Sequence, residues 1–244
     1  MKNDIKITII IPAFNEALHL EQSFLEVDKA VSSLNLTTQF IIVDDASTDN
    51  TFEVAQKLEK DRGVTVISNE SNLNLGGAYK AGLECAIGEY ISWVPADCSH
   101  RSDQLKRVYE HLGAADFLIA IPDNRHVRPF KRQVISALYT FIVNMLSGEK
   151  VKYYNGLSVY KTADLKAMSI KSNGFSFQAE LICRCLSKGL SHKLCWTSLE
   201  IEEKRGSNAF SIKNILQAAA TFRLIAQLRF FKWFQAMYRK NLCK

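Results

Sequence analysis

Long apolar runs are missing from this sequence. No stretch approaches the ~18 uninterrupted apolar residues that a membrane-spanning helix requires, so we expect none. We also expect no signal peptide, because Lys2 and Asp4 are followed directly by a strand-like run. The six cysteines form no CxxC pair and no His–Cys spacing suited to zinc, which predicts the reduced cysteines of a cytosolic protein.

Acidic residues are absent from one part of the chain. Residues 211–244 contain seven of the 31 Lys and Arg residues and no Asp or Glu, whereas residues 1–210 carry 24 basic against 25 acidic residues. The formal net charge of +6 therefore belongs to the C-terminal segment. A basic segment of this kind favours an anionic partner, either a membrane surface or a nucleic acid.

Segments of strand length alternate with helical patterns through the first half of the chain. The composition, 47% hydrophobic and 23% charged, is that of a globular protein. We expect strands at residues 5–11, 40–45, 64–68 and 90–94, and helices at 16–34, at 50–60 and ending at Gly88. This alternation predicts βαβ units in a doubly wound sheet, whose ligands bind at the carboxyl ends of the strands.

The second half is less regular. We expect strands at residues 116–121, 157–162 and 193–203, and helices at 128–148, at 175–189 and from near Ser211. We therefore predict one domain, residues 1–210, and a basic amphipathic helical appendage, residues 211–244. The apolar stripe expected along this helix consists of Ile212, Ile215, Leu216, Ala219, Phe222, Ala226, Phe230, Trp233 and Met237. We expect residues 212–222 to pack on the domain, and residues from Leu224 onward to lie at a membrane interface.

The stretch "EYISWVPADCSH", residues 89–100, predicts a strand that runs into a polar turn. Asp97 is the one carboxylate in that turn. An Asp-Asp pair and a loop rich in Asn and Gly precede it in the sequence, and together these segments suggest a site for a phosphate-rich ligand and its metal. Such sites often present two acidic side chains one residue apart, but the first of those positions here is Pro95.

Four motifs stand in a fixed order: "IPAFNE" (11–16), "IIVDDASTDNT" (41–51), "NLNLGGAYKAGLECAIGEY" (72–90) and "VPADCSH" (94–100). Their order and spacing resemble those of the inverting family 2 glycosyltransferases. The likeness is to the dolichol-phosphate mannosyltransferase and polyprenyl-phosphate glycosyltransferase branch, and it continues through "RPFKRQVIS", "NGLSVYKTADL", "GFSFQAEL" and "EKRGSNAFSIKN". The resemblance implies an α/β protein with the GT-A fold: a Rossmann-like, mixed and mostly parallel sheet flanked by helices, followed by a C-terminal amphipathic helix.

The resemblance implies a nucleotide-sugar site at the ends of the first strands. Its residues would be Pro12, Ala13, Asn15, Glu16, Asp44, Asp45, Gly76, Gly77, Ala96 and Asp97. Carboxylates there can accept hydrogen bonds from a base N–H or from ribose hydroxyls, and free N–H groups at a helix start favour phosphate. The alternatives are that Asp44 caps a turn, that the two glycines form only a tight turn, and that Lys80 is solvated rather than facing phosphates.

The resemblance also implies Mg²⁺ or Mn²⁺, with Asp97 and Ser99 as the protein ligands. One carboxylate suffices where phosphate oxygens and water complete the octahedron. The chain departs from the family at Pro95, which replaces the first acid, and at Ser99, where glutamine is frequent. His100 is either a secondary ligand or a plain surface residue.

The second half would supply the acceptor side. The resemblance gives Asp97, Glu180, Arg132 and Arg205 as catalytic, and Arg128, Lys131, Arg132, Gln178, Arg205 and Ser207 as ligands of an acceptor phosphate. Arginine suits phosphate because its planar fork donates two hydrogen bonds at once. The alternatives are that the basic residues form a solvated face, and that Glu180 either stabilises a helix dipole or acts as the base for a sugar hydroxyl.

The expected function is transfer of a sugar, with inversion, from a nucleoside diphosphate sugar to a membrane-surface acceptor, specifically a polyprenyl (dolichyl or undecaprenyl) phosphate. We expect a metal-assisted hexosyltransferase on the cytoplasmic face of a membrane, with no nucleic acid partner. Two alternatives remain, transfer to a saccharide hydroxyl in glycan assembly and a degenerate nucleotide-binding module without turnover. A nucleotidyltransferase is disfavoured because no Gly-rich "GxGxRx"-like turn follows the first strand.

Overall fold

The computed structural model describes residues 4–198 and 212–242. Its strands are β1 (Ile7–Ala13), β2 (Thr38–Asp44), β3 (Thr65–Ser68), β4 (Tyr90–Trp93), β5 (Phe117–Pro122), β6 (Ser158–Lys161) and β7 (His192–Thr197). Its helices are α1 (Leu20–Ser32), α2 (Thr51–Arg62), α3 (Leu75–Cys85), α4 (Ser102–Tyr109), α5 (Phe130–Ser147), α6 (Thr162–Lys166), α7 (Phe177–Ser187) and α8 (Ile212–Leu242), with a 3₁₀ turn, η1, at Arg125–Val127. The division expected at residue 210 falls outside the described residues and stays a prediction.

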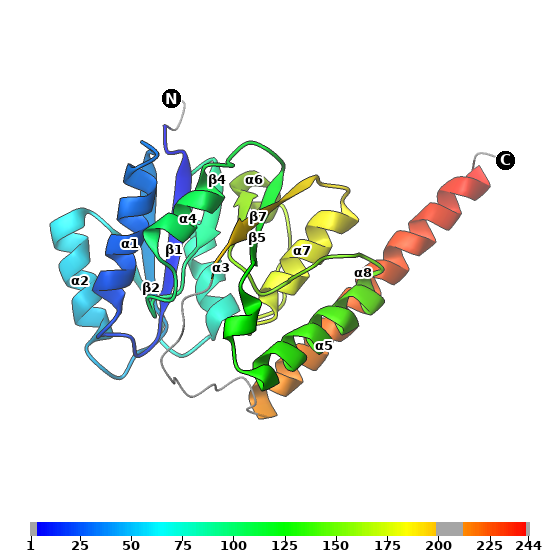
Figure 1. The fold of residues 1–244 in the computed structure, drawn as a ribbon. Coiled ribbons are helices and arrows are strands. Elements are labelled where there is room, and N and C mark those ends of the chain that lie inside the picture. The colour runs from blue at the N-terminus through cyan, green and yellow to red at the C-terminus, as the bar shows by residue number, and fades with distance from the viewer. Residues whose placement is uncertain (1–3, 199–211, 243–244) are drawn as a thin grey trace.

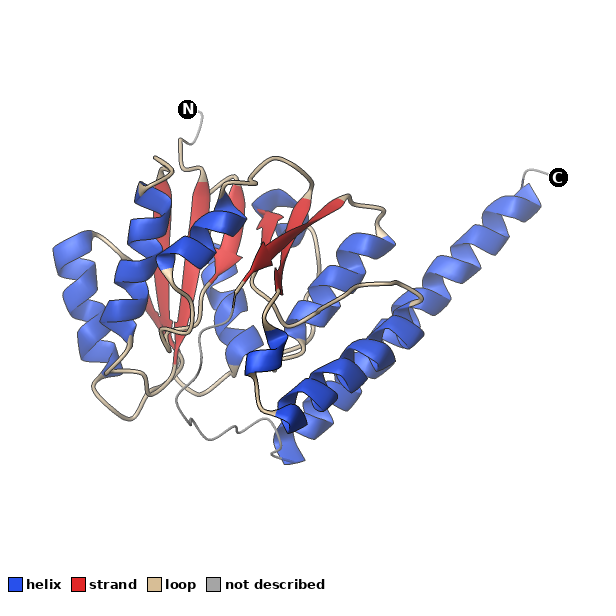
Figure 2. Ribbon diagram, viewed as in Figure 1, coloured by secondary structure: helices blue, strands red, loops and turns tan. Residues whose placement is uncertain are grey.

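The strands form one mixed sheet in the order β3-β2-β1-β4-β6-β5-β7 (Figure 2). The pairs β1–β2, β2–β3, β1–β4 and β5–β7 are parallel, and only β6 runs antiparallel to its neighbours. The expected strands and helices of the first half are all present. However, α3 ends at Cys85 rather than at Gly88, and α4 and α6 were not expected from the sequence.

Strand β1 passes through a proline that was expected to end it. Pro12 pairs with Val43 of β2, whereas the pairing of β1 with β4 stops at Ile10. The carbonyl of Ile10 points toward β4. Because backbone groups alternate in direction along a strand, the nitrogen of Pro12 also points toward the β4 side, but beyond the last residue pair of β1 and β4. Proline is tolerated there because no ladder hydrogen bond needs its missing N–H.

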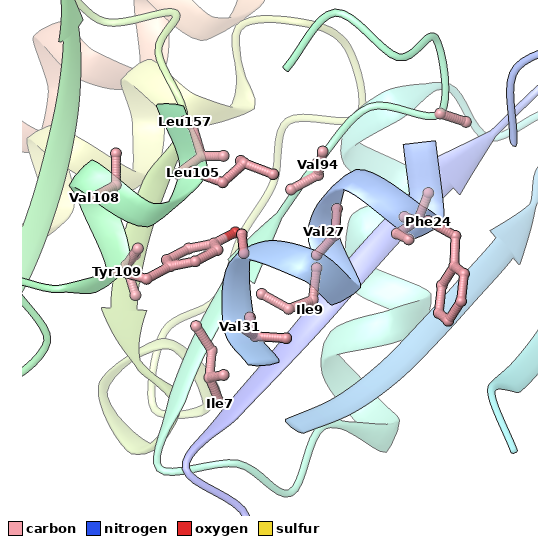
Figure 3. Packing of buried hydrophobic residues seen from close by; sticks show 14 of the residues in the cluster. Ile7, Ile9, Phe24, Val27, Val31, Val94, Leu105, Val108, Tyr109 and Leu157 are labelled. Carbon is pink, nitrogen blue, oxygen red and sulfur yellow. The ribbon is translucent and has the colours of Figure 1, made fainter. Parts of the chain in front are cut away.

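Two apolar cores cover the two faces of the sheet. Alternate residues of β1 point to opposite faces, so Ile9 packs under α1, α2 and α4, while Ile10 packs against α3 and α7. Figure 3 shows the first core, where Val27 of α1 lies over β1 and the ring of Phe24 lies over β2, with its centroid 5.1 Å from that of Phe40. The second core also takes in Val143 of α5 and Ile225 of α8. This sandwich of helices around one sheet fixes the strand ends that carry the polar motifs.

The long helix α8 packs against α5 and α7, and its far end extends beyond α5 (Figure 1). The side chains of Thr221 and Ile225 are buried, while Leu216 is exposed. The expected stripe through Leu216 and Ala219 is therefore wrong, and packing on the domain continues past Leu224. No described helix is both long enough and apolar enough to cross a membrane.

Asp116 ties together the start of β5, the end of β6 and the start of β7. Its carboxylate accepts hydrogen bonds from the Lys161 ammonium at 2.6 Å and from the N–H and hydroxyl of Ser191 at 2.9 and 2.7 Å. These hydrogen bonds favour the charged carboxylate and therefore lower the pKa of Asp116. The hydrogen bond from Lys161 is the largest cause of this shift.

We predict that this carboxylate contributes acid-sensitive stability. Because its folded-state pKa lies below the unfolded value of about 4, the contribution is present above that pH and is lost as the pH falls through the folded pKa. Thermal unfolding of wild type and Asp116→Asn should therefore differ at neutral pH and converge in acid, whereas Asp103→Asn, an exposed control on α4, should follow wild type throughout. A difference in melting temperature between wild type and Asp116→Asn that stays constant at all pH values would contradict this prediction.

Candidate active site

The turn after β1 is fixed by the loop after β2. Asn15 adopts a left-handed backbone conformation, with φ of 56°. Its N–H donates to the hydroxyl of Ser47 at 3.0 Å, and its side-chain carbonyl accepts the N–H of Thr48 at 2.8 Å. The N–H of Glu16 donates to the hydroxyl of Thr51 at 2.8 Å. Asn15 and Glu16 thus sit beside the end of β2, as expected, and Asn15 has a structural role.

The two aspartates after β2 have different environments, although both are buried. The carboxylate of Asp45 accepts hydrogen bonds from the side chain of Asn69 at 2.8 Å and from the N–H of Leu73 at 2.9 Å. In Asp44, one oxygen accepts the N–H of Ser47 at 3.4 Å, and the other has no partner among the described residues. A buried acceptor left over in this way suits a ligand N–H or hydroxyl. Asp44 therefore keeps a buried acceptor oxygen that no described residue uses, while Asp45 shapes the loop.

The start of α3 does not offer its N–H groups to a phosphate. Both Gly76 and Gly77 donate to the carbonyl of Asn173, at 2.7 and 3.3 Å. A Cβ at Gly76 would lie 2.7 Å from the carbonyl oxygen of Ser172, so glycine is required for this close approach. Lys80 contacts the side-chain carbonyl of Asn173. The prediction of free N–H groups here is wrong, because the loop before α7 occupies them.

The turn after β4 carries Asp97 in a half-buried position. One Asp97 oxygen accepts the N–H of Ser99 at 3.0 Å, and the Ser99 hydroxyl lies 3.1 Å from Nδ1 of His100. Burial is the largest cause that lowers the pKa of His100; the charge of Asp97 opposes the shift, and the charge of Arg128 adds to it. The ring is therefore neutral at pH 7, and His100 is not a plain surface residue.

The donor set at this turn fits only one kind of metal site. In residues 4–198 and 212–242, no three His, Cys, Asp or Glu side chains are grouped closely enough to hold a metal ion. A metal site built from three such side chains is therefore absent from that part of the chain. Asp97 fits a divalent ion that takes most of its oxygen ligands from a diphosphate and water.

A cavity of about 690 Å³ lies between α5, α8, the start of α7 and the end of β4. Most of its wall is apolar, and it includes Trp93, Tyr139 and Phe222. Two guanidinium groups, Arg128 and Arg132, line the same cavity, whereas no described Asp, Glu or His does. Arg128 also donates to the hydroxyl of Tyr153 at 2.9 Å. The cavity is therefore mostly apolar and carries two cationic groups.

The residues expected on the acceptor side separate into three groups. Arg128, Arg132 and Gln178 line the cavity. Lys131 is exposed and is not among the lining residues, so its expected role at the acceptor stays a prediction. Arg205 and Ser207 lie outside the described residues.

Glu180 is a structural residue. Its side chain is completely buried and accepts hydrogen bonds from the N–H of Lys171 at 3.0 Å, the N–H of Ser172 at 2.7 Å and Nε of Arg184 at 2.7 Å. It holds the loop that contacts Gly76, and it does not line the cavity. The expectation that Glu180 is catalytic is wrong, because its lone pairs are occupied and no acceptor can reach it.

Comparison with known proteins decides the family. Residues 8–163 match Glycosyl transferase family 2, which is more than half of the chain. The chain belongs to this family. An undecaprenyl-phosphate mannosyltransferase of Micrococcus luteus is 30% identical over 198 residues, which cover 75% of this chain and 79% of that protein. A dolichol-phosphate mannosyltransferase of Pyrococcus furiosus is 32% identical over 139 residues, covering 54% of this chain and only 38% of that protein.

The fold is shared with solved structures of the GT-A class. The structure of glucosyl-3-phosphoglycerate synthase from Mycobacterium tuberculosis with Mn²⁺ and UDP-glucose superposes with a TM-score of 0.65 at 16% identity, covering 91% of this chain and 78% of that one. The mixed, mostly parallel sheet flanked by helices, with a helix after it, confirms the expected fold class.

Three lining or edge residues of this family 2 chain were not expected from the sequence. Trp93 lies at the end of β4, the hydroxyl of Tyr153 accepts a hydrogen bond from Arg128, and Phe14, which follows β1, is 45% exposed. Trp93 and Phe14 adjoin apolar strands, so their apolar character indicated core positions. The cavity that Trp93 and Tyr153 line is completed by distant segments of the chain, which a local pattern does not show.

Proposed function

We propose that this protein transfers a sugar, with inversion, from a nucleoside diphosphate sugar to a polyprenyl phosphate. The observation that carries the proposal is the mostly apolar cavity that Arg128 and Arg132 also line. A phosphate with a hydrocarbon chain matches both features of this cavity. The names of the M. luteus and P. furiosus relatives specify acceptors of the same class.

The absence of a base among the described lining residues favours phosphate over a hydroxyl. A sugar hydroxyl needs a general base to take its proton as it attacks. Glu180 was the candidate base, but its carboxylate already accepts hydrogen bonds from the N–H groups of Lys171 and Ser172 and from Nε of Arg184. A phosphate monoester is already an anion at neutral pH, so it needs positioning rather than deprotonation.

The donor side is assigned to the residues at the carboxyl ends of β2 and β4, Asp44 and Asp97. The unpartnered oxygen of Asp44 would accept an N–H or hydroxyl of the nucleoside, and Asp97 would hold a divalent ion on the diphosphate. The ion, Mg²⁺ or Mn²⁺, neutralises the charge of the leaving diphosphate when bound. The M. tuberculosis protein binds Mn²⁺ with its nucleotide sugar, which supports this assignment.

A phosphoglycerate acceptor is the second candidate, because the M. tuberculosis neighbour is named for it. The two arginines would suit either phosphate. The apolar wall formed by residues such as Ile135, Leu138 and Phe222 favours the lipid, since a small polar acid would leave it unfilled.

The function is tested by offering candidate nucleotide sugars with farnesyl phosphate, phosphoglycerate or a free saccharide. We expect release of nucleoside diphosphate and labelled sugar on the lipid only. Sugar transfer to phosphoglycerate or a saccharide instead would refute the proposal. No turnover with any donor would favour a nucleotide-binding module without activity.

A lipid acceptor implies that the protein acts at a membrane surface. We propose that this is the cytoplasmic face. Two neighbouring helices present exposed apolar side chains: Val134, Leu138, Phe141 and Met145 on α5, and Phe230, Phe231, Trp233 and Phe234 on α8. The segment that contains α8 has basic residues and no acid. Aromatic and basic residues together are typical of helices that lie in an anionic membrane interface.

We predict that the end of α8 binds vesicles containing phosphatidylglycerol. Because Ile225 is buried, truncation near residue 222 would expose the core, so paired substitutions are used instead. Phe231→Ser with Trp233→Ser should weaken binding roughly tenfold or more, since each ring loses its apolar burial. Binding by wild type should also weaken with added salt.

Leu18→Ser with Ile87→Ser is the matched control, because both residues are exposed but lie away from α5 and α8. Sedimentation of each variant with vesicles measures the binding. If the two double variants lost vesicle binding equally, or if the α8 variant lost none, α8 would not be the membrane-binding element.

A further inference from the structure

Helix α1 holds the turn that carries Asp97 at two points. Before Asp97, the carbonyl of Pro95 accepts a hydrogen bond from the hydroxyl of Ser23 at 2.8 Å. After it, the carboxylate of Glu26 accepts the N–H of Ser102 at 2.8 Å. The two α1 residues are three positions apart, so they lie on one face of the helix. That face of α1 therefore fixes the turn on both sides of Asp97.

Both contacts are sheltered from water. Ser23 is 1% exposed, and the side chain of Glu26 is 13% exposed. Glu26 also accepts a hydrogen bond from the guanidinium of Arg101 at 3.3 Å. Within the turn, Cys98 has φ of 56°, a left-handed conformation that residues other than glycine seldom adopt. Such a conformation persists where the surroundings hold it, and the contacts to α1 provide that support.

The start of α1 is fixed in turn to the loop after β2. The N–H of Glu16 donates to the hydroxyl of Thr51 at 2.8 Å, and the N–H of Ala17 donates to the carboxylate of Asp49 at 3.3 Å. Helix α1 also packs against α4, which begins at Ser102 (Figure 1). The position of the turn after β4 is therefore set relative to the end of β2.

A site with one protein carboxylate depends strongly on how well that carboxylate is placed. Asp97 is the only acidic residue in residues 94–101, because Pro95 stands where the family often has the first acid. Ordering a ligand during binding costs free energy, and a ligand that is held beforehand avoids most of that cost. Loss of the groups that orient metal ligands typically lowers metal affinity roughly ten- to a hundredfold.

We propose that Ser23 and Glu26 are positioning residues that set the affinity of the Asp97 turn for its divalent ion. The inference rests on the proposed function, which assigns that ion to Asp97. Neither residue needs to touch the ion, because each acts through the backbone of the turn. Their loss should weaken metal binding while leaving the nucleoside side of the site intact.

The test titrates Mn²⁺ into the full chain in the presence of GDP or UDP and follows free Mn²⁺ by electron paramagnetic resonance. Ser23→Ala removes the donor to the Pro95 carbonyl, and Glu26→Ala removes the acceptor for the Ser102 N–H. Each variant should raise the Kd for Mn²⁺ roughly tenfold. The Kd for the nucleotide without metal should stay within about twofold of wild type. General damage to the fold would weaken both.

Three further variants serve as controls. Glu26→Gln keeps an oxygen that can accept the Ser102 N–H, so it should recover most of the Mn²⁺ affinity. Glu21→Ala removes the same charge from α1 at a side chain that is 52% exposed. Ser187→Ala, at the end of α7, removes a hydroxyl that also donates to a backbone carbonyl at 2.8 Å. The last two should bind Mn²⁺ as wild type does.

Thermal melting shows whether each variant is folded, and Glu26→Ala alone decides the matter if Ser23→Ala is not. Kd values for Mn²⁺ within about twofold of wild type would overturn the inference, as would equal losses of nucleotide binding with and without metal. A wild type that binds no Mn²⁺ with either nucleotide would overturn it too. Sugar transfer to the lipid by wild type, with unchanged Mn²⁺ binding in the variants, refutes the inference alone. Loss of Mn²⁺ affinity in the variants of a protein that transfers sugar to a saccharide refutes the proposed function alone.

Discussion

Asp97→Asn should reduce sugar transfer by about a thousandfold or more, the scale expected when charge stabilisation at a departing diphosphate is lost. Asp97 is the only carboxylate in the turn after β4, and the described residues contain no cluster that could replace it. The amide keeps the size of the side chain and can still accept the N–H of Ser99, so the fold of the turn should survive. Release of nucleoside diphosphate, measured over a range of Mn²⁺ and Mg²⁺ concentrations, gives the result.

Asp103→Asn is the matched control because Asp103 is exposed on α4, six positions away, and should transfer at the wild-type rate. Pro95→Asp would place a second acidic side chain two positions before Asp97. We expect it to lower the metal concentration needed for half-maximal rate, since its carboxylate would replace a water ligand. Full activity of Asp97→Asn would show that Asp97 is not the metal ligand.

The sheet and its functional edge could be predicted because they depend on local patterns. Buried β-branched runs such as 40–45 predict strands, and alternation with helices places their carboxyl ends together. The short helix α4, "SDQLKRVY", was missed because its eight residues contain few apolar positions, and its start is held by Glu26 from α1. Contacts of that kind are not visible in a local pattern.

The roles of individual side chains were harder to predict for the same reason. Glu180 lies in a motif that resembles the family's acceptor region, but backbone N–H groups eight and nine residues earlier occupy its carboxylate. Gly76 and Gly77 precede a helix as a phosphate-binding turn would, yet a loop almost a hundred residues later takes their N–H groups. In α8, apolar residues lie on several sides, so the buried face, with Thr221 and Ile225, is set by α5 and α7. Motifs thus indicated which segments to consider, while tertiary contacts decided what each of these side chains does.

Loss of either cavity arginine should prevent use of a lipid phosphate. Arg128→Ala and Arg132→Ala should each lower transfer to farnesyl phosphate roughly ten- to a hundredfold, because a charge-assisted hydrogen bond to phosphate is lost. Lys131→Ala is the matched control: it removes the same charge from an adjacent, exposed residue that does not line the cavity. The loss should appear in kcat/KM for the lipid, with KM for the nucleotide sugar unchanged. Equal effects of Lys131→Ala and Arg132→Ala would mean that general surface charge, not the cavity, attracts the acceptor.

Glu180→Gln separates the phosphate acceptor from the hydroxyl acceptor in the same assays. Because Glu180 is buried with Arg184 at 2.7 Å, the variant should lose stability on the order of 3 kcal/mol, the scale for breaking a buried ion pair. The molecules that remain folded should still transfer sugar to farnesyl phosphate near the wild-type rate, since Glu180 does not line the cavity. Thermal melting and activity per folded molecule measure the two effects. A variant with wild-type stability that has lost transfer, above all transfer to a free saccharide, would instead make Glu180 the base for a hydroxyl and overturn the phosphate assignment.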